Sequence, residues 1–234
     1  MRSNGLAEHP GLPLPILLCP MRSARRMRLR IKDGAQLKLT YPARLSRSKA
    51  LSWAAGQAQW VEEQLASLMP AEPFVPGAVI PVEGQELRLI WLEKEPRAPR
   101  FQSGTIVAGG PISSFSGRIE RFLKKRAVEL LSQETADFSS VLGVTPKSVS
   151  VGDASTRWGS CSSTGRIRYS WRLILAPAEA RRYVVAHEVA HLKELNHGPA
   201  FKRIERELYG DEVAAAKALL RSVGPRLRRL GLSG

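Results

Sequence analysis

The stretch VVAHEVAHLKELNHGPAF, residues 184–201, contains three of the four histidines of this 234-residue chain. Its apolar residues recur at three- and four-residue steps and predict a helix over about residues 177–195. Positions i and i+4 of a helix lie on one face, so His187 and His191 can offer imidazole nitrogens to one ion. Glu188 lies on the flank of that face. The stretch therefore predicts a metal site on a helix.

The letters HEVAH are an instance of the H-E-x-x-H pattern. In this pattern two neutral imidazoles hold Zn²⁺, and the glutamate takes the proton of a metal-bound water. We therefore expect Zn²⁺ as the cofactor, His187 and His191 as ligands and Glu188 as the catalytic base.

A third ligand must come from outside the helix, because a catalytic zinc has three protein ligands and one open position. We favour His197, because histidine is scarce elsewhere and residues 196–199, Asn-His-Gly-Pro, should stop the helix there. A glutamate of the following segment, Glu205 or Glu207, is the alternative third ligand.

The rest of the chain predicts an α+β protein. Alternation around an Asp33-Gly34 turn predicts a hairpin over residues 27–41, and a second hairpin should turn at Glu83-Gly84. Helical spacing predicts one helix behind Ser46 or Ser48 and a long helix from Ser116. Strand-like runs occupy residues 148–151 and 167–174. We expect a disordered extension over residues 1–24, a β-rich lobe with one helix over 25–110 and a catalytic domain over 111–234.

The chain carries a formal net charge of +15, with 36 Lys and Arg against 21 Asp and Glu. Eleven basic residues lie between Arg2 and Lys49, against two acids. We interpret them first as a solvated face that gives at most weak, nonspecific nucleic-acid binding. The apolar patch over residues 12–18 contains two prolines and is too short to span a bilayer, so no membrane contact is expected. Two cysteines are too few for a disulfide framework, which favours the cytoplasm.

Two stretches carry a family resemblance: TRWGSCSSTGRIRYSWRLILAP, residues 156–177, and YVVAHEVAHLKELNHGPAF, residues 183–201. Together they resemble the YgjP-like metallopeptidase family, which is related to SprT-like zincins. The match is dense over residues 157–201 and looser over most of the chain after residue 25. Ser170, Gly198 and Lys202 depart from the usual residues, and none of them is a proposed ligand. The resemblance implies a zincin-like catalytic domain and a zinc-dependent hydrolase.

Taken together, these features predict a zinc-dependent metallopeptidase that acts on a peptide or protein substrate. We expect the substrate to lie along the strand at residues 165–174, since peptides commonly bind by adding a strand to a sheet edge. A DNA-associated SprT-like protease, recruited by the positive charge, is one rival. A non-catalytic domain with structural zinc is another, although a structural site normally closes with four protein ligands. Nothing in the sequence predicts the oligomeric state.

Four further residues invite functional readings. Cys161 is a candidate nucleophile, although a small thiol in such a turn is more often packed. Arg157 can orient a substrate carbonyl or pair with an acid such as Asp153. Tyr169 and Tyr183 are candidate donors to a developing oxyanion, with core packing as the favoured interpretation.

Overall fold

The computed structural model describes residues 5–32, 36–68, 70–154 and 157–232. The chain divides into two compact units, Met1–Met69 and Pro70–Gly234. Each unit has its own cluster of buried apolar side chains. Helices and sheets are mixed throughout the described residues, which confirms the predicted α+β class.

The first unit is built on a four-stranded sheet in the order β1-β2-β4-β3. Its strands are β1 (Gly5–Ala7), β2 (Ile16–Met21), β3 (Arg28–Lys32) and β4 (Gln36–Pro42). The β3–β4 hairpin is confirmed, whereas the Asp33-Gly34 turn lies outside the described residues. The prediction of disorder over residues 1–24 is wrong for β1 and β2, because β2 pairs in parallel with β4 and its Ile16 and Leu18 are buried.

Two helices of the first unit, α1 (Arg47–Ala55) and α2 (Ala58–Leu68), stand where one helix was predicted. Of the two caps that the sequence offered, Ser46 and Ser48, it is Ser46 whose hydroxyl caps α1, by accepting the N–H of Lys49 at 3.2 Å. Gly56 separates the helices, because glycine lowers helix propensity. Small residues of α1, Ala50 and Ala54, are buried in the same cluster as the strand residues of the sheet.

The second unit begins with a sheet in the order β5-β6-β8-β7. Its strands are β5 (Val79–Val82), β6 (Gln85–Trp91), β7 (Arg100–Gln102) and β8 (Thr105–Ala108). The predicted turn at Glu83-Gly84 is confirmed, with φ of 52° and 83°. This sheet belongs to the second unit and not to the lobe expected over residues 25–110. Its buried Leu89 and Ile106 share one core with Phe115 and Ile119 of the following helix.

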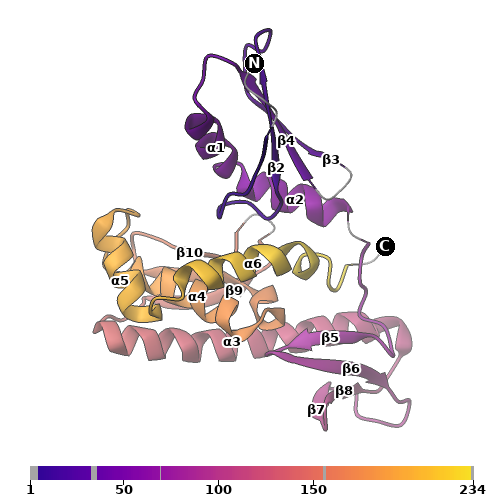
Figure 1. The fold of residues 1–234 in the computed structure, drawn as a ribbon. Helices are drawn as coiled ribbons and strands as arrows, with labels where there is room; N and C mark the ends of the chain where they lie inside the picture. The colour runs from indigo at the N-terminus through magenta and orange to yellow at the C-terminus, as the bar shows by residue number, and fades with distance from the viewer. Residues whose placement is uncertain (1–4, 33–35, 69, 155–156, 233–234) are drawn as a thin grey trace. The chain divides into compact units, whose positions relative to one another are not determined.

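A long helix and a second sheet follow in the second unit (Figure 1). The 3₁₀ turn η1 (Ile112–Ser114) leads into α3 (Phe115–Leu142), and the sheet has the order β10-β11-β9. Its strands are β9 (Ser148–Gly152), β10 (Gly159–Cys161) and β11 (Arg166–Ser170), followed by the 3₁₀ helix η2 (Trp171–Leu175). The run predicted as one strand over residues 167–174 is therefore half strand and half 3₁₀ helix.

Three helices complete the unit: α4 (Ala178–Ala190), α5 (Pro199–Tyr209) and α6 (Val213–Leu227). A buried ion pair joins α4 to α3, with Arg181 Nη2 3.0 Å from Glu134 Oε1. Removing one partner of such a pair would leave a buried charge, so the pair fixes how α4 lies on α3. No helix among the described residues is both long and apolar enough to cross a membrane.

Candidate metal centre

Helix α4 presents two of the predicted site residues to one side. Pro177 occupies the N-cap position, and the last residue of the helix is Ala190, so His191 is the C-cap. The helix is thus shorter than predicted, yet it still places His187 one turn before His191. Their ring centroids are 4.9 Å apart.

A tight turn after α4 returns the chain toward the same face. The Gly198 N–H donates to the Asn196 carbonyl at 2.7 Å, and the Asn196 N–H donates to Glu194 Oε1 at 3.1 Å. Gly198 has φ of −75°, so the turn does not use the left-handed conformation that its glycine suggested. Pro199 then starts α5 at a position where its missing N–H costs nothing. The turn brings His197 to the other two histidines.

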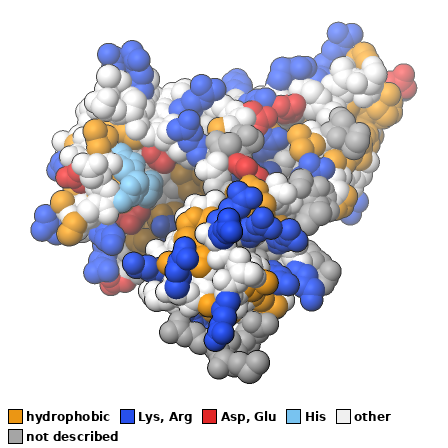
Figure 2. Space-filling view, turned by 90° about the horizontal axis from the view of Figure 1, so that it is seen from above, with side chains coloured by type: hydrophobic (Ala, Val, Ile, Leu, Met, Phe, Trp, Pro, Cys, Tyr) orange, Lys and Arg blue, Asp and Glu red, His pale blue; other side chains and the backbone are white. Residues whose placement is uncertain are grey.

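The three histidines form a compact group of nitrogen donors. One ring nitrogen from each of His187, His191 and His197 lies within 4.8 Å of the others. His187 Nε2 and His197 Nε2 are 3.2 Å apart. Figure 2 shows histidine side chains gathered at the surface with acidic side chains beside them. Phe201 of α5 packs against all three rings, with centroids 4.5 to 5.0 Å away.

The outer nitrogens of two histidines are held by neighbouring acceptors. His187 Nδ1 is 2.6 Å from Glu205 Oε1, and His191 Nδ1 is 3.0 Å from the Glu194 carbonyl oxygen. These contacts leave Nε2 of both rings for an ion. Glu205 therefore supports the His187 ring, and this geometry favours His197 over Glu205 as the third donor.

The surroundings favour the neutral form of two of the three imidazoles. Burial lowers the pKa of His191, and the charge of His187 lowers it further, although the Glu194 carbonyl opposes this. Burial and the charge of His187 also lower the pKa of His197. Metal ions bind the neutral form of imidazole, so these two rings are suited to bind a metal.

Glu188 is buried against β10. Its side chain is only 5% exposed, and an added Cβ at Gly159 would lie 2.5 Å from Glu188 Oε1. Burial raises the pKa of Glu188 to about 7, while the charges of His187 and Arg157 and a hydrogen bond from the Cys161 N–H lower it. The carboxylate therefore occupies a slot that exists because residue 159 has no side chain.

The other candidate residues lie around this centre in different roles. Tyr169 is buried, and its hydroxyl is 3.0 Å from Thr135 Oγ1. Tyr183 is also buried, and its ring contacts the Tyr209 ring with centroids 5.8 Å apart. Both side chains thus pack in the core, as the favoured interpretation expected.

Cys161 and Arg157 lie on the β10 side of the centre. Burial and the charge of Glu188 raise the pKa of Cys161 to about 11, so the thiol is not prepared as a nucleophile. Asp153 pairs with Arg172, so Arg157 does not take the acid suggested for it. Arg157 is exposed, and its charge acts on Glu188 instead.

Sequence reasoning missed three contributors: Gly159, Phe201 and the supporting role of Glu205. Gly159 belongs to the stretch RWGSCS, residues 157–162, but the neighbouring sequence does not show which side chain packs against it. Phe201 lies four residues after His197, near the start of α5. This spacing predicts a contact between the two side chains once the position of α5 is known. Glu205 was named, but as a ligand.

Among known proteins, the chain matches a metallopeptidase family. A protein-family model described as YgjP-like, metallopeptidase domain, matches residues 25–222. No curated protein matches the chain. Among solved structures, the chain is similar to the crystal structure of the metallopeptidase zymogen of Pyrococcus abyssi abylysin, with 21% identity and a TM-score of 0.34, covering 37% of this chain and 87% of that chain. At these values the similarity has no bearing on the site.

Proposed function

The chain belongs to the YgjP-like metallopeptidase family, and from this premise we propose that it hydrolyses peptide bonds with one zinc ion held by His187, His191 and His197. Family membership makes the protein a metal-dependent peptidase. The metal, its ligands and the catalytic base are our proposal.

The donor set supports zinc. Imidazole nitrogens bind Zn²⁺ at about 2.0–2.1 Å in tetrahedral geometry, which corresponds to about 3.3 Å between two ligand nitrogens. The 3.2 Å between His187 Nε2 and His197 Nε2 fits this value. Among the described residues the group has three donors, as in catalytic zinc sites, and not the four of a structural site.

Glu188 is the residue proposed to move the proton. A zinc ion supplies a Lewis acid that lowers the pKa of a water molecule toward ~7 and polarises the scissile carbonyl. The Glu188 carboxylate accepts the proton of the attacking water and passes it to the leaving nitrogen, as a positioned general base does. The slot at Gly159 holds this carboxylate beside His187, and burial excludes competing water from it.

The substrate is proposed to lie along β10 and not along the strand at residues 165–174. That strand, β11, is the middle strand of its sheet, so β9 and β10 already occupy both of its hydrogen-bonding edges. Strand β10 lies at the edge of the described sheet and contains Gly159, the residue against Glu188. A peptide that adds to β10 would bring its backbone close to the proposed base.

The observation that carries the proposal is the convergence of three histidine nitrogens next to a buried glutamate. Its test is Glu188→Gln, which keeps shape and removes the basic carboxylate. We expect about one zinc per chain, as in the wild type, and peptide hydrolysis reduced by about 10² to 10⁴-fold.

The matched control is Glu207→Gln, an exposed glutamate of α5 that the sequence offered as an alternative ligand. It should change neither zinc content nor hydrolysis. Metal analysis and hydrolysis of a quenched fluorescent peptide are measured on the same preparations. Full activity in Glu188→Gln, or loss of zinc from it, would contradict the assigned role.

A further inference from the structure

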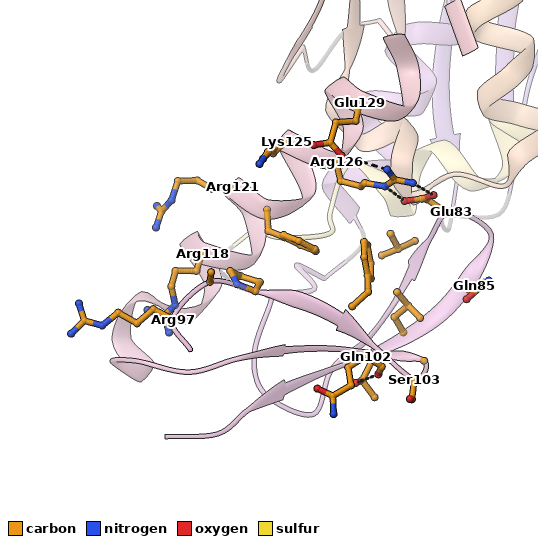
Figure 3. Close-up of a pocket in the computed structure, with 18 residues that line it drawn as sticks. Glu83, Gln85, Arg97, Gln102, Ser103, Arg118, Arg121, Lys125, Arg126 and Glu129 are labelled. Carbon is orange, nitrogen blue, oxygen red and sulfur yellow. Dashed lines mark hydrogen bonds and ion pairs between the residues drawn. The ribbon is translucent and has the colours of Figure 1, made fainter. Parts of the chain in front are cut away.

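A pocket of about 960 Å³ lies between the β5–β8 sheet and the first half of α3, inside the second unit (Figure 3). Its lining residues all fall between Val82 and Glu129. None of them belongs to the segment from β9 to α6, which carries the histidine group. The metal centre therefore does not account for this pocket.

The floor of the pocket is apolar and partly open to solvent. The rings of Phe101 on β7 and Phe122 on α3 contact each other, with centroids 5.0 Å apart at an angle of 59°. Phe101 is 42% exposed, which is unusual for a side chain of this size. The side chains of Val82 and Leu87 also line the pocket. This floor offers an apolar contact to a ligand.

The rim of the pocket is basic. Figure 3 shows Arg97, Arg118, Arg121 and Lys125 along one side. No carboxylate among the described residues forms an ion pair with any of these four. The fifth cation, Arg126, is neutralised by Glu83, with Nε 2.7 Å and Nη2 3.0 Å from the carboxylate oxygens. The rim thus has an excess of positive charge that the protein does not balance locally.

Arg118 gives the most specific signal on this rim. Its Nη1 donates to the Ser114 hydroxyl, but its Nε and Nη2 atoms are buried and have no hydrogen-bond partner among the residues that the structure describes. Buried donors without an acceptor cost free energy, and guanidinium donors match the two oxygens of a carboxylate. Arg118 is half-buried and lines the pocket, so a small turn of its side chain would present these donors to an anionic group from outside the protein.

The surroundings favour a peptide as the source of that anion. Glu83 and Glu129 also line the pocket and would repel a run of phosphates. Figure 3 shows both of them beside Arg126 and away from Arg118, so one carboxylate can bind at Arg118 without meeting them. The two rings are tilted and do not form parallel faces for stacked bases. Strand β7 is at the edge of the described sheet, so its outer backbone groups can pair with an extended chain.

We propose that this pocket is a docking site for acidic, apolar peptide segments. A carboxylate of the peptide binds the Arg118 guanidinium, and a neighbouring apolar side chain packs on Phe101 and Phe122. The proposal goes beyond peptide hydrolysis, because binding in this pocket needs neither the metal nor Glu188.

The test is direct binding of a short labelled peptide in which aspartate and glutamate flank a Leu-Phe pair, measured by fluorescence anisotropy with the full chain at low salt. Arg118→Ala should weaken binding about tenfold or more, the usual cost of removing a charge-assisted hydrogen bond. The affinity of Arg118→Lys should lie between those of Arg118→Ala and the wild type, because lysine keeps the charge but lacks the paired N–H donors of the guanidinium group. Phe101→Ala should also weaken binding. Because the Phe101 side chain is partly exposed, we expect this variant to remain folded.

Lys147→Ala is the matched control, because it removes one exposed positive charge outside the pocket. It should bind like the wild type, and thermal melts of all variants check that they are folded. The Glu188→Gln variant should bind the peptide with the same affinity as the wild type. Peptide binding in the pocket can therefore be tested even if the proposed peptidase activity is not found.

Three outcomes would overturn the proposal. The first is no binding of the acidic peptide by the wild type. The second is equal loss of affinity in Lys147→Ala and Arg118→Ala. The third is tighter binding of labelled oligothymidine than of the peptide, with the same dependence on Arg118 and Phe101, which would assign the pocket to single-stranded nucleic acid.

Discussion

A single added methyl group at Gly159 should disable the proposed base without removing the metal. The Cβ of Gly159→Ala would lie 2.5 Å from Glu188 Oε1 and 2.7 Å from its Cγ. Nonbonded heavy atoms prefer about 3.5 Å or more, so the carboxylate must move by roughly 1 Å. A misplacement of that size in a catalytic group costs about 10²-fold in rate. We therefore expect kcat/KM to fall by about 10²-fold.

The assay is hydrolysis of a quenched fluorescent peptide, with zinc content measured on the same samples. Zinc should remain near one per chain, because the three atoms nearest to the added Cβ all belong to Glu188. Gly198→Ala is the control: it lies next to His197, yet nothing lies within 4 Å of its added Cβ. It should keep both zinc and activity. Wild-type activity in Gly159→Ala would refute the reasoning, because the carboxylate could then not act from its observed position.

Two further predictions concern the neighbours of the centre. Glu205→Gln removes the negative charge next to His187 Nδ1, so zinc affinity, measured by competition with a chelator, should fall by about 10 to 100-fold. An unchanged affinity would contradict the supporting role of Glu205. Cys161 should react with iodoacetamide about tenfold more slowly than a free thiol at pH 7. Raising the Cys161 pKa from 9.0 to about 11 lowers the thiolate fraction about 100-fold, and the greater nucleophilicity of that thiolate restores only part of the rate. Mass spectrometry of the labelled Cys161 peptide measures the rate of alkylation. Alkylation as fast as that of a free thiol would show that burial does not protect Cys161.

The sequence predicts elements best where a local pattern and its end signals coincide. The hairpin at Glu83-Gly84 and the cap at Ser46 are of this kind, because the turn and cap chemistry lie within a few residues of the pattern. The α4 helix was predicted for the same reason. Its end at Ala190 was missed, because the apolar residue Leu192 continues the pattern beyond it.

Elements that depend on distant partners were predicted poorly. Strand β2 contains too short an apolar run to signal itself, and its pairing with β4 joins residues about twenty apart. The run from Ile167 to Ile174 is buried almost throughout, and periodicity cannot separate a buried strand from a buried helical turn. The place of β11 in the middle of its sheet is likewise set by β9 and β10, which no local pattern reveals.

The candidate site divides in the same way. His187 and His191 follow from helix geometry alone, and scarcity made His197 the best third donor. The slot at Gly159 could not be predicted, because it depends on how β10 meets α4 across about thirty residues of chain. The same limit hid the contact between Glu205 and His187 Nδ1, because the sequence does not show which ring nitrogen a nearby carboxylate meets.

The turn between α4 and α5 sets how tightly the metal and the fold are coupled. All three proposed ligands come from one short stretch of chain, so an ion bound there closes a loop of only about ten residues, and such a closure restrains little of the unfolded ensemble. The core of the second unit instead gathers apolar side chains from Phe74 to Leu230. We therefore expect this core to form without the ion, which can bind after the chain has folded. Substitutions in the turn could then change metal affinity with little effect on the stability of the core.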